Sequence, residues 1–183
     1  MAPLTSVQRR RLRTLLLAGS EQGTLLRLGE MCSVFARRGY RLEDLLVEDG
    51  MEDLHREQLA EAVAAYRAHR EGFLYLAVNA AYAPGLHKIG ASRISPEARR
   101  QSLRSAGVPG RFVLVKSWPV PDAFAAETSC REALHDRRVE RDFYAGHYAE
   151  LTNFLDQVVA HEYEVGKRLG FSDFSCTTLS SQP

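Results

Sequence analysis

Five charged or phenolic side chains could act together on an anionic group. Tyr75 and Lys88 lie on the two strands of a predicted hairpin and should be neighbours. Arg99 falls among apolar positions of a predicted helix, where it must find a carboxylate, a carbonyl or a phosphate, because an unpaired buried charge is costly. Glu127 lies on the apolar seam of a later helix and therefore needs a cation. Arg131, one turn on, is one candidate, and a divalent metal is the other.

The hairpin that carries Tyr75 and Lys88 is predicted by FLYLAVNAAYAPGLHKIG at 73–90. Its first strand has apolar residues on both faces, as a central strand requires. The segment 79–85 contains the turn residues. The return strand ends at Gly90, where the backbone could approach another group closely.

The segments after the hairpin predict alternating helices and strands. Ser95 and Pro96 provide an N-cap and a first-turn proline for a helix to about Ala106. The β-branched and aromatic run 112–118 predicts a third strand. We therefore expect an α/β fold with a small three-stranded, mainly antiparallel sheet flanked by helices. The remaining predicted segments are a helix over 123–137, a connection over 140–147 and a last helix from 148 to about 167.

An all-helical region is expected to precede this α/β part, because leucines recur at helical spacing between the breaks at Gly19 and Gly39. A DNA-reading helix-turn-helix is one interpretation, but Glu43 and Asp44 suit a major groove poorly. A packing element, or contacts with a protein partner or a second copy, is favoured instead. The predicted helices are 5–18, 22–38 and 51–70, and the predicted domains are a helical region 1–70, an α/β domain 71–166 and a flexible tail 167–183.

Composition sets broad limits. The 183 residues are 45% hydrophobic with a formal net charge of +1, which is typical of a soluble globular chain. Three distant cysteines suggest neither a disulfide framework nor a zinc site, so we expect a cytoplasmic location. No stretch approaches the length of a membrane span. Positive charge is local: between residues 88 and 116 the basic residues are Lys88, Arg93, Arg99, Arg100, Arg104, Arg111 and Lys116, against Glu97 alone.

A motif pair and three further short motifs, in order over residues 73–144, resemble the GIY-YIG nuclease superfamily. FLY at 73–75 stands for GIY, and KIG at 88–90 stands for YIG, the form found in the phage-type branch with lysine. SPEARRQSL at 95–103 resembles the helix with the catalytic arginine, and AAETSCREAL at 125–134 the helix with the metal-binding glutamate. RDFY at 141–144 resembles the closing Arg-Glu-Phe-Phe motif.

The resemblance implies a metal-dependent endonuclease that hydrolyses phosphodiester bonds in DNA, with one Mg²⁺ or Mn²⁺ on Glu127. Arg99 would bind the scissile phosphate, Tyr75 would position or deprotonate the attacking water, and Lys88 would stabilise charge near the phosphate. Further substrate-binding residues are expected at Gly90, Ser92, Arg93, Arg100, Arg104 and Arg131.

Three positions depart from the family pattern. Lys88 replaces the second tyrosine, Arg131 stands where many relatives have histidine, and Asp142 replaces the glutamate of the closing motif. His135 lies one further turn along and could substitute only if the helix were shifted. Two alternatives to cleavage therefore stay open: a catalytically weak module that binds nucleic acid without cutting it, and an interaction protein that uses the fold as a scaffold.

Overall fold

A computed structural model describes residues 4–19, 21–47, 53–104, 109–171 and 179–180. The chain forms two compact units. The helical unit comprises Met1–His69 and Glu164–Asp173, and the sheet unit comprises Arg70–Tyr163 and Phe174–Pro183. Among the described residues, the chain passes from one unit to the other at the end of the fourth helix and within the last helix.

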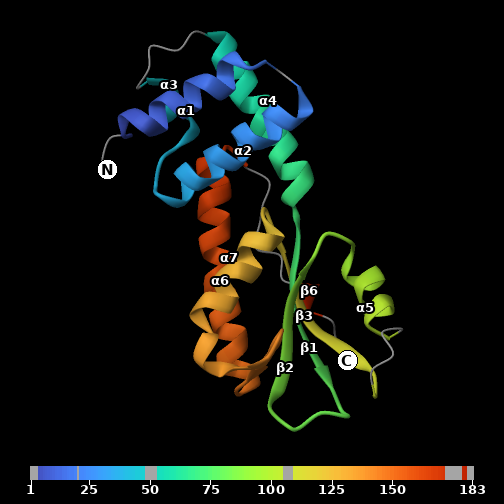
Figure 1. Ribbon diagram of the computed structural model, residues 1–183. Helices are drawn as coiled ribbons and strands as arrows, with labels where there is room; N and C mark the ends of the chain where they lie inside the picture. Colours follow the sequence, from blue (N-terminus) through green and yellow to red (C-terminus); the bar gives the residue numbers. More distant parts are fainter. Residues whose placement is uncertain (1–3, 20, 48–52, 105–108, 172–178, 181–183) are drawn as a thin grey trace. The chain divides into compact units, whose positions relative to one another are not determined.

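The helical unit confirms the predicted helices of the first seventy residues (Figure 1). The first helix begins with a capping box, in which the Thr5 hydroxyl accepts from the Gln8 amide and the Gln8 side chain accepts from the Thr5 amide. A buried hydrogen bond joins the second and fourth helices, because Tyr66 Oη donates to Ser33 Oγ at 2.9 Å. The helices are α1 (Ser6–Leu17), α2 (Gln22–Arg37), α3 (Leu42–Val47) and α4 (Asp53–Arg70).

The sheet unit contains an antiparallel sheet of six strands among the described residues, in the order β4-β5-β2-β1-β3-β6. The predicted hairpin is present, and its register places Tyr75 opposite Gly90 and Ala77 opposite Lys88. The strands are β1 (Gly72–Asn79), β2 (Leu86–Ser92), β3 (Phe112–Val120), β4 (Arg138–Glu140), β5 (Phe143–Ala145) and β6 (Leu179–Ser180).

The prediction of a three-stranded sheet was therefore wrong. Residues 138–140, just after the helix expected over 123–137, form β4, and residues 143–145, expected as part of a connection, form β5, which pairs with β2. Strand β6, in the segment expected as a tail, pairs with β3 at Lys116 and Ser117. Strands of two or three residues are too short to show the alternation of apolar and polar residues by which a strand is recognised. All three residues of β4 are exposed.

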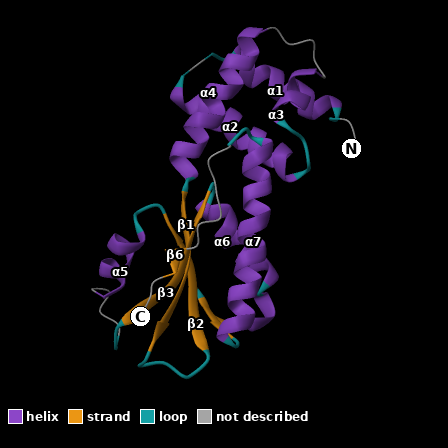
Figure 2. Cartoon of the chain, turned by 180° about the vertical axis from the view of Figure 1, so that it is seen from behind, coloured by secondary structure: helices purple, strands orange, loops and turns teal. Residues whose placement is uncertain are grey.

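Helices cover both faces of this sheet (Figure 2). One face, with Leu74, Leu76 and Trp118, packs against the apolar sides of α6 and α7. The opposite face, with Tyr75 and Ala77, packs against Leu103 of α5. The helices are α5 (Pro96–Arg104), α6 (Ala123–Ala133), the short 3₁₀ helix η1 (His135–Arg137) and α7 (Tyr148–Arg168).

Candidate functional site

Tyr75 and Arg99, which lie on β1 and α5, are in direct contact. Arg99 Nη2 and Nε donate to the Tyr75 hydroxyl at 2.8 and 3.2 Å, and the guanidinium carbon lies 5.3 Å from the ring centroid. The tyrosine is 2% exposed, whereas the arginine is partly exposed. Arg99 thus lies on the side of its helix that faces the sheet, although Ala98, expected on the same side, is exposed.

Gly90 provides the space that Tyr75 occupies. The two residues are opposite each other on β1 and β2, and a Cβ atom at position 90 would lie 2.6 Å from the tyrosine hydroxyl. A side chain there would displace the phenol and, with it, the acceptor of both Arg99 hydrogen bonds. In the structure, Gly90 therefore shapes the site through Tyr75.

Lys88 lies diagonally across the hairpin from Tyr75 and forms an ion pair with Asp142. Lys88 Nζ donates to Asp142 Oδ2 at 2.9 Å and lies 5.3 Å from the centroid of the Phe143 ring. The lysine side chain is 13% exposed and the aspartate side chain 38%. The Asp142 carbonyl also accepts from the Ile89 amide at 3.0 Å, which fixes the aspartate beside β2.

Glu127 lies on α6, which begins at the N-cap Asp122, whose Oδ1 accepts from the Ala125 amide at 2.9 Å. Its side chain is 24% exposed, and Arg131 Nη2 lies 3.6 Å from its Oε1. The structure therefore contains the ion pair between Glu127 and Arg131 that was one of the two interpretations, and this pair is long and partly exposed.

Burial raises the pKa of Glu127, and the nearby Asp142 carboxylate raises the pKa further. Arg131, Lys88 and Arg99 act in the opposite direction and lower it. Although α6 and α5 cover opposite faces of the sheet, charges from both sides thus act on one carboxyl group. The structure places Glu127, Lys88, Arg99 and Asp142 in one electrostatic neighbourhood.

The other residues predicted to bind substrate differ from one another in their surroundings. Ser92 Oγ donates to the Ile94 carbonyl at 3.3 Å, and the side chains of Arg93 and Arg100 are exposed. Arg131 contacts Glu127, and the side chain of Arg104 lies outside the described residues. Arg93 and Arg100 are thus accessible to a large anionic partner.

Asp142 is the residue of this site that sequence reasoning missed. It was noted only as a departure from a motif, yet it pairs with Lys88 and affects the pKa of Glu127. The signal that could have found it was its place in RDFY, just before Phe143, which contacts the same lysine.

Comparison with known families gives one match for this region. Residues 72–159 match the family model of the T5orf172 domain, a phage-associated, nuclease-like domain. The matched segment includes Tyr75, Lys88, Arg99, Glu127 and Asp142. No model of a GIY-YIG family matches, so membership of that superfamily stays a prediction. Comparisons with curated proteins and with solved structures found no match.

The number of possible metal ligands in the protein limits the chemistry. The described residues contain no group of three or more His, Cys, Asp and Glu side chains placed to hold a metal ion. A metal here would thus take most of its ligands from water and substrate.

Among the helices of the described part, none is long and apolar enough to cross a membrane.

Proposed function

We propose that the sheet unit is a metal-dependent endonuclease that hydrolyses phosphodiester bonds in DNA. The observation that carries this proposal is the state of Arg99. Its partly buried guanidinium donates to the Tyr75 hydroxyl, and within the described residues it has no carboxylate partner. A pre-positioned guanidinium without an anion suits a phosphate group, to which it can donate two parallel hydrogen bonds. The match to a nuclease-like domain supports the same class of reaction.

Tyr75 would orient the attacking water. Its hydroxyl oxygen accepts two hydrogen bonds from Arg99, which leaves the O–H free to donate. A phenol that donates in this way positions a water or a phosphate oxygen. Its position is set by the glycine opposite, because no other residue would leave room for the ring.

Lys88 would stabilise the negative charge that develops on the phosphate. Its ammonium group is mostly buried, so its interaction with a phosphate is weakly screened by solvent. Asp142 holds the ammonium in place through the 2.9 Å ion pair. The aspartate is then a positioning residue for the lysine.

The donor set fits Mg²⁺ or Mn²⁺ held by Glu127, with Asp142 as the neighbouring carboxylate. Burial, and after it repulsion from the Asp142 carboxylate, raise the pKa of Glu127, and a bound cation would offset both effects. Few protein ligands suit Mg²⁺, which keeps several waters and binds substrate phosphate. When bound, the ion would supply an activated water and charge stabilisation.

A second candidate function is nucleic-acid binding without cleavage. The observation that favours it is the contact between Arg131 and Glu127, at 3.6 Å. A guanidinium beside the proposed metal ligand partly neutralises the carboxylate and competes with a cation. Substituting Arg131 should therefore separate the two functions.

Incubation of supercoiled plasmid with the full chain and Mg²⁺ or Mn²⁺ tests the proposal. The parent protein should nick or linearise the plasmid, and Glu127→Gln and Arg99→Ala should each lose at least about 100-fold of the rate. The matched controls are Glu132→Gln on α6 and Gln101→Ala on α5, both exposed residues of the helices that carry the substituted ones. Both controls should retain cleavage.

Three outcomes are informative. If the plasmid stays intact and all proteins retard it in a gel, binding would replace cleavage as the function. Cleavage restored in Arg131→His would then identify the arginine as the cause of the missing cleavage. Cleavage that persists in Glu127→Gln would overturn the role of this glutamate. Absence of both cleavage and retardation in the parent would overturn both candidate functions for DNA.

A further inference from the structure

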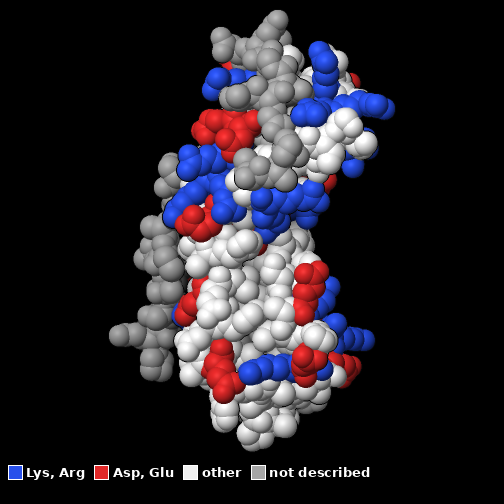
Figure 3. Space-filling view, turned by 90° about the vertical axis from the view of Figure 1, so that its left-hand side faces the viewer, with Lys and Arg blue, Asp and Glu red and all other residues white. Residues whose placement is uncertain are grey.

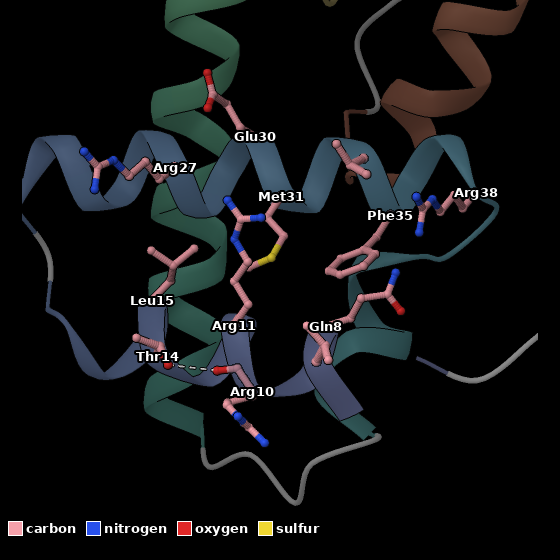
Figure 4. Close-up of a pocket in the computed structure, with 12 residues that line it drawn as sticks. Gln8, Arg10, Arg11, Thr14, Leu15, Arg27, Glu30, Met31, Phe35 and Arg38 are labelled. Atoms are coloured by element: carbon pink, nitrogen blue, oxygen red, sulfur yellow. Dashed lines mark hydrogen bonds between the residues drawn. The ribbon is translucent and has the colours of Figure 1, made fainter. Parts of the chain in front are cut away.

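A groove runs between α1 and α2 of the helical unit, and none of its lining residues belongs to the proposed catalytic site. It encloses about 730 Å³ and is lined from both helices (Figure 4). Its apolar lining includes Leu15 of α1 and Met31 and Phe35 of α2. Val7 and Val34, which also line it, are 69% and 48% exposed. Apolar side chains left open to water in a concave surface are typical of binding sites.

Arginines surround this apolar lining. Arg10 and Arg11 come from α1, Arg27 comes from α2, and Arg38 is the C-cap residue of α2. Figure 4 shows Arg11 extending beside Met31, whereas Glu30 points away from α1. Among the described residues that line the groove, Glu30 is the sole carboxylate. In Figure 3 several basic side chains gather on the face of the helical unit that is turned to the viewer.

These arginines are available to a partner. All four side chains are exposed, and none forms an ion pair with a described carboxylate. Helix α1 has no acidic residue, so no neighbour on the same helix neutralises Arg10 or Arg11. The groove therefore combines an apolar floor with an uncompensated positive rim.

We propose that this groove binds an acidic amphipathic helix of a partner protein. The apolar face of such a helix contacts Met31, Val7 and Val34, and its carboxylates meet the arginine rim in bidentate pairs. Charge complementarity of this kind also steers association and makes it dependent on salt.

Two features favour a peptide over nucleic acid. Duplex DNA is contacted by convex elements that enter its grooves, and its backbone offers nothing to apolar side chains such as Val7 and Val34. Single strands bind by stacking on exposed aromatic rings, but Phe35 is only 2% exposed. An acidic helix matches both the floor and the rim. The proposal does not depend on the activity of the sheet unit.

The probe is a labelled model peptide of about 18 residues with leucines at the i, i+3, i+4 and i+7 positions of a helix and glutamates elsewhere. Fluorescence anisotropy with the full chain should give a dissociation constant on the order of 10 μM at low salt, as expected for a small interface. The double variant Arg11→Glu/Arg27→Glu and the variant Val34→Asp should each weaken binding at least about tenfold. Arg13→Glu is the matched control, because this exposed residue lies on α1 outside the groove; it should change the affinity less than about twofold.

Circular dichroism must show unchanged helix content in every variant, and Val34→Ala keeps the test valid if Val34→Asp does not fold. Equal binding of a peptide with the same residues in scrambled order, or of one with lysine for glutamate, would overturn the proposal. If a short DNA duplex displaces the peptide, and the same variants bind this duplex more weakly, the groove would be assigned to nucleic acid. A dimer of the chain that Arg11→Glu dissociates would assign it to a second copy. No peptide binding at about 1 mM would also overturn it.

Discussion

At the scale of single residues, the contact between Tyr75 and Arg99 determines what the site can do. The phenol is buried and its oxygen accepts two hydrogen bonds from the guanidinium, so each group sets the position of the other. Removing the hydroxyl removes the two hydrogen bonds and preserves the packing of the ring. The effect on catalysis can therefore be separated from the effect on the fold.

Tyr75→Phe should lower plasmid cleavage about 100-fold while the protein remains folded, because orientation of the water and of Arg99 is lost together. The melting temperature should change by only a few degrees, as expected for the loss of a partly exposed hydrogen bond. Tyr82→Phe is the control: this ring packs between Phe112 and Phe143, and its substitution should leave cleavage unchanged. Equal loss in both variants would argue for a packing role.

The pKa of Glu127 gives a second prediction at this scale. Because Asp142 raises this pKa and Arg131 lowers it, Asp142→Asn should lower it and Arg131→Gln should raise it. At a pH between the ordinary pKa of a glutamate and the raised pKa of Glu127, a larger fraction of the Glu127 carboxyl is protonated than of a free glutamate side chain. Carbon-13 NMR titration of metal-free protein measures these shifts directly. Shifts of the same sign in the two variants would contradict the arrangement of charges described above.

At the scale of elements, the sequence predicted the parts of the fold that have long, regular patterns. The hairpin 73–90, the capped helix after Ser95 and the β-branched strand β3 are all present. Strands β4 and β5 were missed because three residues carry no periodicity, and β5 is defined by its pairing with β2. The inward position of Arg99 followed from helical spacing. Its contact with Tyr75 did not, because that contact depends on how α5 packs on the sheet.

The packing of α2 against α4 provides a prediction about elements. A Cβ atom at Gly29 would lie 2.4 Å from the Ala62 carbonyl oxygen and 2.5 Å from Tyr66 Cβ. Gly29→Ala should therefore separate the two helices and destabilise the helical unit by about 1–3 kcal/mol. Gly23→Ala on the same helix is the control, because a Cβ there meets nothing within 4 Å; it should stabilise by about 0.5–1 kcal/mol.

Urea unfolding monitored by circular dichroism measures both changes. Gly29→Ala should also leave plasmid cleavage intact at temperatures where the helical unit is folded, since the residues of the candidate site lie in the sheet unit. Equal free energies of unfolding for the two variants would contradict close packing at Gly29.

At the scale of the whole molecule, the nearly neutral chain cannot attract DNA through its net charge. The formal net charge is +1, so affinity for a polyanion must come from local groups such as those around Arg99. Beyond about 8–10 Å, physiological salt screens the more distant charges. The dependence of DNA binding on salt thus counts the basic side chains that contact phosphate.

Binding of a short duplex to the Glu127→Gln protein, measured over a range of salt concentrations, should give a straight line of log affinity against log salt. Adding Arg99→Ala should make its slope shallower by about 0.9, which corresponds to one lost phosphate contact. Arg13→Ala on α1 should leave the slope unchanged if DNA is bound by the sheet unit alone. A slope that changes with Arg13 but not with Arg99 would place the nucleic acid on the helical unit, and the partly buried guanidinium beside Tyr75 would then need another anion.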